Sequence, residues 1–231
     1  MVKKAIIYHH LGLGDHFTCN ALVHHIAKDY DEVYVACKRR NEHTVKHMYE
    51  DYHNINIFEV DKEPDDIFDF STISEMPVIK IGFEHTDPFN FEESFYKQFG
   101  LTLDNKNSEF KLPTNLSKSI LYYLNVSNEF PNDFIFVHDE STAGKYNLNI
   151  ESDLDRFVVE KEDTNDIFDY VHTICAAKEI HFINSGLFPL IVLLYHRNML
   201  QAEKIYYHNI RKFHEGGHPI VVPENFITVR Y

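Results

Sequence analysis

The sequence predicts an α/β protein built from two domains that each contain a parallel sheet. Apolar strand-like runs alternate with helix-like runs, and the alternation starts again after a turn cluster at residues 130–133 (Phe-Pro-Asn-Asp). Strands separated by helices need crossover connections, which favour parallel pairing. The 231 residues leave room for two domains of about 100 residues each. We therefore expect two Rossmann-like domains, 1–125 and 126–231, joined within residues 113–132.

The first domain is predicted from short β-branched and aromatic runs. The opening strand, residues 5–8, leads through a glycine-containing turn into a helix over about 17–28. Residues 89–99 are dense in phenylalanine and end at Gly100, which is typical of a helix with a glycine C-cap. Its aromatic side chains fit either packing on the sheet or stacking on a sugar ring. The remaining elements are strands 33–37, 55–60 and 78–81 and a helix over 44–52.

The second domain repeats this order of elements. Residues 165–177 carry apolar side chains on one helical stripe, and residues 187–196 are apolar enough for a buried helix. The expected strands are 134–138, 156–159, 179–184 and 204–208. We find no internal repeat and no low-complexity segment.

Charge and cysteine content limit the class of protein. A formal net charge of −14 argues against wrapping nucleic acid or docking on an anionic membrane, although residues 38–40 (Lys-Arg-Arg) form a local basic run. The three cysteines are few and widely spaced, which indicates reduced thiols. No signal-peptide pattern opens the sequence, and the longest apolar run, 187–195, is too short to cross a bilayer. We expect a cytoplasmic protein and make no prediction of its oligomeric state.

The turn after the first strand, residues 12–15 (Gly-Leu-Gly-Asp), is the first candidate site. A dinucleotide fingerprint needs a third glycine, but Phe17 stands there, and basic residues replace the acidic residue expected after the second strand. The lysine of a Walker loop is also missing. The alternatives are a plain strand-to-helix turn, an Asp15 that caps the helix, and an Asp15 that accepts a proton from a hydroxyl. The candidate residues are Gly12, Gly14, Asp15 and the neighbouring His16.

Two further turns carry groups that suit phosphate. The loop after strand 134–138 offers hydroxyl groups and a lysine, which bond and neutralise phosphate oxygens; it also fits an ordinary polar loop. The turn at 184–186 (Asn-Ser-Gly) precedes a helix whose N-terminal amides attract anions, but Ser185 also fits a simple N-cap. The surroundings of Ser185 do not match a hydrolase nucleophile. The candidates are His138, Ser141, Thr142, Lys145, Asn184, Ser185, Gly186 and, on the adjacent strand, His181.

The sixteen histidines do not predict a metal site. His43 and His47 have the spacing of a helical metal pair but lack the glutamate of the metalloprotease motif. The adjacent pairs at 9–10 and 24–25 point to different faces. We therefore expect no metal, and we expect the histidines beside the glycine turn to position a substrate or to be structural.

The order of these motifs resembles the two-domain GT-B glycosyltransferases, and in particular the heptosyltransferase-type enzymes and related small glycosyltransferases. The resemblance rests on the glycine turn that ends in Asp15, the His-Asp-x-Ser-Thr-x-x-Lys loop from His138 to Lys145, and the turn at 184–186. It spans most of the chain. Two residues depart from the family: Asn184 replaces an aspartate, and Pro189 stands where a histidine is expected. The chain is also shorter than the usual enzymes.

The resemblance implies a reaction and a role for each domain. The first domain would receive a glycan or other hydroxyl acceptor, with Asp15 as general base. The second would bind a nucleotide-diphosphate sugar through Ser141, Thr142, Lys145 and residues 184–186, across a central cleft. We expect metal-independent, inverting transfer with no cofactor besides the donor substrate.

Other functions fit the same residues. Pyruvyl transfer to a saccharide and epimerisation of a nucleotide sugar both suit a scaffold of this kind. A non-catalytic nucleotide- or carbohydrate-binding protein fits the departures at Asn184 and Pro189. An NADP-dependent oxidoreductase would need Arg39 to hold the extra phosphate.

Overall fold

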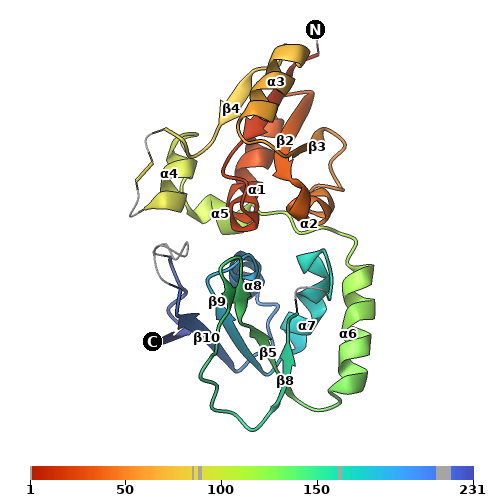
Figure 1. Cartoon of the computed structure of the whole chain (residues 1–231), viewed down its shortest axis with the longest axis vertical. Helices are drawn as coiled ribbons and strands as arrows, with labels where there is room; N and C mark the ends of the chain where they lie inside the picture. The colour runs from red at the N-terminus through yellow and green to blue at the C-terminus, as the bar shows by residue number, and fades with distance from the viewer. Residues whose placement is uncertain (1, 85, 88–89, 161–162, 212–219) are drawn as a thin grey trace. The chain divides into compact units, whose positions relative to one another are not determined.

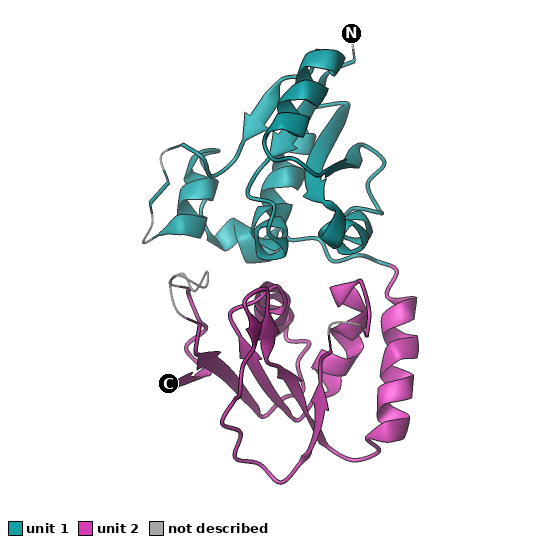
Figure 2. Cartoon of the chain, in the orientation of Figure 1, with its two compact units in different colours: residues 1–114 teal, residues 115–231 magenta. Residues whose placement is uncertain are grey.

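The computed structural model describes residues 2–84, 86–87, 90–160, 163–211 and 220–231 (Figure 1). The chain forms two compact units, 1–114 and 115–231 (Figure 2). The division lies earlier than the predicted boundary at 125/126, which falls inside helix α6 (Ser117–Glu129). This helix belongs to the second unit because it packs on its neighbours there, and the Ser119 hydroxyl accepts a hydrogen bond of 2.9 Å from the His172 amide.

The first unit is a four-stranded parallel sheet in the order β3-β2-β1-β4. The chain runs from β1 outward to β2 and β3, then returns to place β4 on the other side of β1. The reversal makes the carboxyl ends of β1 and β4 a topological switch point, the usual ligand position in such sheets. The strands are β1 (Lys4–Tyr8), β2 (Glu32–Lys38), β3 (Ile55–Val60) and β4 (Val78–Lys80).

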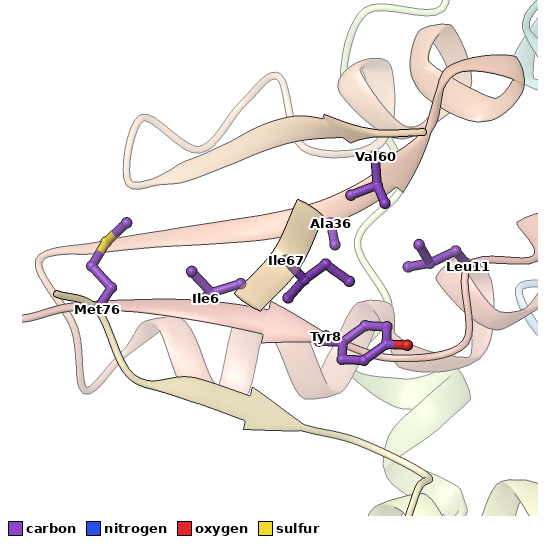
Figure 3. Packing of buried hydrophobic residues seen from close by; sticks show 7 residues of the cluster. All are labelled: Ile6, Tyr8, Leu11, Ala36, Val60, Ile67 and Met76. Atoms are coloured by element: carbon purple, nitrogen blue, oxygen red, sulfur yellow. The ribbon is translucent and has the colours of Figure 1, made fainter. Parts of the chain in front are cut away.

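The two faces of this sheet are covered by different helices. Helix α1 (Leu13–Ala27) and helix α2 (Glu42–Met48) contact β2. The sequence analysis left helix α3 (Asp65–Ser74) unassigned, yet its Ile67 is fully buried in a cluster on the opposite side (Figure 3). That cluster contains Ile6, Tyr8, Leu11, Ala36, Val60, Ile67 and Met76. The unit is completed by η1 (Arg39–Asn41), α4 (Phe91–Lys97) and α5 (Asp104–Ser108).

The second unit contains a five-stranded parallel sheet in the order β11-β10-β9-β5-β8. The chain goes from β5 to β8 on one side, then to β9, β10 and β11 on the other. The switch point therefore lies at the carboxyl ends of β5 and β9. The strands are β5 (Phe134–His138), β8 (Asp155–Val158), β9 (Glu179–Ile183), β10 (Lys204–Asn209) and β11 (Ile227–Arg230).

Helices and an extended segment cover the second sheet. Tyr170 and Phe188 pack against the aromatic residues Phe136 and Phe182 of the strands. A different cluster joins Ile135, Val137 and Ile183 to Leu148, which lies in the segment between β5 and β8. The other elements are η2 (Ile167–Tyr170), α7 (Val171–Ala176), α8 (Leu187–His196) and a small antiparallel pair, β6 (Glu140–Ser141) with β7 (Gly144–Lys145).

Every strand that the sequence predicts is present in the structure, with ends that agree within a residue or two. The predicted helix at 165–177 is divided into η2 and α7, and the aromatic helix is α4, whose predicted first residue, 89, lies outside the described residues. The first helix starts at Leu13 rather than Phe17. Asp15 therefore lies in the first turn of the helix and not in the loop before it.

Candidate functional site

Asp15 lies in the first turn of α1, at the switch point of the first unit. Gly12 is the N-cap and has extended backbone angles, φ −72° and ψ 150°. Its carbonyl accepts hydrogen bonds from the Asp15 and His16 amides, at 3.1 and 3.2 Å, which begin the helix. A carboxylate in this position is favoured by the positive end of the helix dipole. The helix thus positions Asp15 directly beyond the end of β1.

A side chain at position 12 would force the Asp15 carboxylate to move, because that carboxylate folds back over Gly12. A Cβ at position 12 would lie 2.6 Å from Oδ2 of Asp15, closer than real Cβ contacts allow. The space that the missing side chain leaves at position 12 is thus taken by Asp15 itself. Gly14 is the second residue of α1.

The surroundings of Asp15 favour its protonated form more than water does. Burial raises its pKa to about 6, His10 lowers the pKa, and the negative charge of Glu92 raises it again. Backbone hydrogen bonds from Gly12 and Asp15 also lower it. A carboxylate with a pKa near 6 is ionised at neutral pH and is a stronger base than an ordinary aspartate.

His10 joins the two strands of the switch point. Its Nε2 donates to the Gly82 carbonyl at 2.9 Å, so in the neutral ring Nδ1 is the acceptor. Its ring packs on Phe83 and Phe95 at centroid distances of 4.7 and 5.9 Å. Gly82 has φ +80°, and a Cβ there would lie 2.3 Å from the Phe95 ring. The loop after β4 is therefore held close to the turn after β1.

Glu92 is a residue of this site that the sequence analysis missed. It lies on α4 and accepts hydrogen bonds from the Thr18 hydroxyl at 2.9 Å and from the Lys106 ammonium group at 2.7 Å to each oxygen. No short motif marks it, because its partners are far away along the chain. A glutamate among the phenylalanines of 89–99 was the only available signal.

His16, a predicted binding residue, is fully buried beside His9, and the two rings lie 4.5 Å apart. Burial lowers the pKa of His9 to about 4 and holds that of His16 well below its usual value. The Nδ1 and Nε2 atoms of His16 have no hydrogen-bond partner among the described residues. His16 thus lies inside the unit, below the turn that carries Asp15.

The switch point of the second unit brings together two predicted residues. The Ser185 hydroxyl lies 3.4 Å from Nε2 of His138, which ends β5. Burial lowers the pKa of His138 to about 4, so its ring is neutral at pH 7. Gly186 is the N-cap of α8, and Pro189 lies in the first turn of this helix. The turn at 184–186 therefore presents a hydroxyl and a helix N-terminus at the end of β9.

The loop after β5, which carries Ser141, Thr142 and Lys145, forms the β6–β7 pair. The Ser141 hydroxyl accepts a hydrogen bond from the Ala143 amide at 3.1 Å, and Thr142 is exposed. The Lys145 ammonium group donates to Glu160 at 2.9 Å and lies 4.0 Å from Asp139. Two carboxylates thus offset the positive charge of Lys145, which the sequence predicted to bind phosphate.

Arg211 is a second residue that the sequence analysis missed. It follows β10, and its guanidinium donates to the Asn184 carbonyl. It also lowers the pKa of Tyr207 against the larger effect of burial, which raises that pKa to about 12. A basic residue three positions after the predicted strand 204–208 was the available signal. Arg211 contacts the turn at 184–186 from the next strand of the sheet.

His181, predicted to be near the donor, belongs to a buried polar chain instead. Its Nδ1 lies 2.9 Å from Nε2 of His208, and Nδ1 of His208 accepts from or donates to the Tyr231 hydroxyl at 2.7 Å. Its Nε2 lies 3.6 Å from Glu179, and its ring stacks on Tyr206. Burial lowers the pKa of both histidines to about 4. These hydrogen bonds link β9, β10 and Tyr231.

The described residues form neither a metal-binding cluster nor a membrane-spanning helix. They contain no group of three or more His, Cys, Asp or Glu side chains arranged to hold a metal ion. None of the helices formed by these residues is long and apolar enough to cross a membrane.

The fold is similar to that of a solved glycosyltransferase. No protein-family model matches the sequence, and no curated protein does. The search of solved structures found the glycosyl transferase family 9 protein from Veillonella parvula DSM 2008, with a TM-score of 0.57 and 9% identity. The match covers 99% of this chain and 87% of that one. The resemblance to the GT-B fold is therefore confirmed as a likeness of fold, over nearly the whole chain.

Proposed function

We propose that this protein is a glycosyltransferase that moves a sugar from a nucleotide-diphosphate sugar to a hydroxyl acceptor, with Asp15 as general base. The observation that carries the proposal is Asp15: a half-buried carboxylate with a pKa raised to about 6, fixed at the switch point of the first unit. The fold likeness to a glycosyltransferase supports the same function.

The proposed step moves the sugar from a phosphate oxygen to the oxygen of the acceptor hydroxyl. The acceptor hydroxyl oxygen bonds to the anomeric carbon while the bond from that carbon to the β-phosphate oxygen breaks. Asp15 takes the hydroxyl proton, and the nucleoside diphosphate leaves with the bonding electron pair. Attack opposite to the leaving group inverts the anomeric carbon.

The second unit supplies groups for the leaving diphosphate. The N-terminus of α8 and the Ser185 hydroxyl lie at its switch point, where hydrogen-bond donors stabilise negative charge that develops in the transition state. We propose that these groups act without a metal ion. The predicted contacts from Ser141 and Thr142 stay a prediction.

A ligand screen followed by a transfer assay tests the proposal. Binding of a UDP-, GDP-, ADP- or CMP-sugar at about 100 times its Kd should add about 2.7 kcal/mol of apparent stability. The donor that binds is then incubated with a panel of glycan acceptors, with and without EDTA. Transfer that survives EDTA and yields the inverted linkage by NMR supports the proposal. Donor binding without transfer to any acceptor would instead favour the non-catalytic binding protein.

A further inference from the structure

We infer that Glu92 is a positioning residue for the proposed reaction, which keeps a fixed negative charge beside Asp15 and so makes Asp15 a stronger base. The inference rests on the proposed function, because the role is exerted on the general base of that reaction. Glu92 lies in the first turn of α4, within the same unit as Asp15. Its charge therefore acts on Asp15 from a different helix.

Helix α4 is attached to α1 one turn after Asp15. The Thr18 hydroxyl donates to the Glu92 carboxylate at 2.9 Å, and the Tyr96 hydroxyl donates to the Thr18 carbonyl at 2.7 Å. Thr18 follows Asp15 by three positions in α1, and side chains at this spacing are neighbours on the surface of a helix. Thr18 and Tyr96 are both buried, so the attachment lies inside the unit. The Glu92 carboxylate is thus fixed close to that of Asp15.

Lys106 of α5 holds the same carboxylate and keeps it ionised. Its ammonium group donates to both oxygens of Glu92 at 2.7 Å. The Lys106 side chain is only 12% exposed, so solvent screens the pair weakly. Two neighbouring carboxylates without a cation tend to share one proton, because like charges oppose ionisation. With Lys106 bound to Glu92, Asp15 is the carboxylate that is left to take a proton.

The charges that act on Asp15 come from several segments of the unit. Burial is the largest cause of its raised pKa of about 6, the His10 ring after β1 lowers the pKa, and Glu92 raises it. On α1, burial holds the pKa of the Cys19 thiol well above its usual value, so this thiol stays neutral. Lys106 lowers the pKa of Cys19, whereas both carboxylates raise it. Among these groups, Glu92 is the one whose charge opposes ionisation of Asp15 and strengthens it as a base.

An NMR titration of the Asp15 carboxyl group tests the inference without an assay of transfer. Glu92→Gln keeps the size of the side chain and an oxygen that accepts hydrogen bonds, but it removes the charge. The Asp15 titration should therefore move below the wild-type pKa of about 6. The resonance of Asp15 is identified by its absence from the spectrum of Asp15→Asn.

The pH profile of transfer tests the same role in the reaction. At about pH 8 Asp15 is ionised in both proteins, so Glu92→Gln should be slower because its base is weaker. The loss should be smaller than the about 10²- to 10⁴-fold expected for removal of the base itself. At about pH 5 the difference should shrink, because more of the variant's Asp15 is ionised. The KM for the acceptor should not change, because Glu92 acts through Asp15.

Glu93→Gln is the matched control, since it removes the same charge from the next position of α4. Glu93 pairs with Lys97 at 2.9 Å, and the two side chains are 38% and 66% exposed. This variant should change neither the Asp15 titration nor the pH profile. Glu92→Asp keeps the charge and should retain most of the wild-type behaviour.

Circular dichroism and melting temperature establish that each variant is folded. If Glu92→Gln does not fold because Lys106 is left without its carboxylate, the double variant Glu92→Gln with Lys106→Gln removes the whole ion pair. Its Asp15 titration should move in the same direction, because Glu92 lies against α1 through Thr18 and its loss should outweigh that of Lys106.

The outcomes separate the role of Glu92 from the proposed function. If the wild type transfers sugar and the loss of the Glu92 charge changes neither the Asp15 titration nor the pH profile, the role is overturned while the proposed function stands. A raised acceptor KM with an unchanged pH profile would also overturn it, because Glu92 would then be a binding residue. If the wild type transfers no sugar from any donor, the proposed function falls and the role in transfer falls with it.

Discussion

The switch points of the two units have the same topology but carry opposite chemistry. In the first unit the turn after β1 holds a carboxylate, Asp15, with a second carboxylate, Glu92, close enough to raise its pKa. In the second unit the turns after β5 and β9 carry a neutral imidazole, a hydroxyl and the N-terminus of α8, and Arg211 contacts them. We propose that the first site takes a proton and that the second holds an anion. The comparison teaches that strand order selects the position of a site, while a few side chains select its chemistry.

The substitution with the largest expected effect, Asp15→Asn, separates the role of general base from that of donor binding. Asp15→Asn should lower transfer by about 10²- to 10⁴-fold, as expected for loss of a general base. Its affinity for a nucleoside diphosphate should be unchanged, because that ligand is proposed to bind the second unit. Turnover with saturating donor and calorimetric binding measure the two quantities. Normal turnover, or lost donor affinity in a folded variant, would break the division of roles.

The same variant should be more stable than the wild type at neutral pH. Because the folded-state pKa of Asp15 is raised to about 6, the folded protein loses stability as pH rises from about 4 through 6. Asparagine does not ionise, so the variant should gain about 2 to 3 kcal/mol at pH 8 and almost nothing below pH 4. Urea unfolding at both pH values checks this. An equal gain at both would mean that the charge of Asp15 is not the cause.

Gly12→Ala tests whether the absence of a side chain at position 12 makes room for the Asp15 carboxylate. The new Cβ would meet the carboxylate at 2.6 Å, so we expect a loss of about 1 to 3 kcal/mol from the crowding. The loss should shrink in an Asp15→Ala background, because the clashing group is then absent. A double-mutant cycle on unfolding free energy measures the coupling. Additive losses would show that Gly12 is required for another reason.

The buried histidines should make the folded protein less stable in acid. Burial lowers the pKa of His9 and His138 to about 4 and holds that of His16 well below its usual value. The unfolded chain therefore binds protons first, and stability should fall as pH drops from about 6.5 to 4. His16→Phe should gain about 1 kcal/mol at pH 7 by removing two unpartnered nitrogens, and its pH dependence should be weaker. A steeper acid loss in this variant would contradict the assignment.

The smallest expected effect concerns the turn of the second unit. Ser185→Ala removes a hydroxyl that lies 3.4 Å from His138 and should weaken donor binding by about threefold, in keeping with a neutral hydrogen bond of about 0.5 to 1.5 kcal/mol. Calorimetry measures the donor affinity of this variant and of Ser141→Ala. Ser141→Ala is the comparison because the Ser141 hydroxyl accepts a hydrogen bond within its own loop. A larger loss at Ser141 would move the donor site toward the β6–β7 pair.

Sequence reasoning reached the strands and the turns because both leave local signals. Runs such as 55–60 and 134–138 are short, apolar and rich in β-branched or aromatic residues, and the structure has strands there. The segments that carry Asp15 and Ser185 both follow such strands. Helix α3 was not predicted, because no element was assigned to residues 65–74, and Ile67 is the residue of this helix that is fully buried.

The sequence by itself thus determined the class of fold, the alternation of elements and the turns at 12–15 and 184–186. Only the tertiary structure decided which strands lie side by side, and with that the partners of each turn. His10 meets Gly82 and Thr18 meets Glu92 more than 70 residues away along the chain, and Arg211 meets Asn184 from the neighbouring strand. It also decided that His16 and His181 are buried and that Lys145 is paired. The physical reason is that local periodicity sets secondary structure, whereas burial and charge pairing depend on contacts that the order of strands brings together.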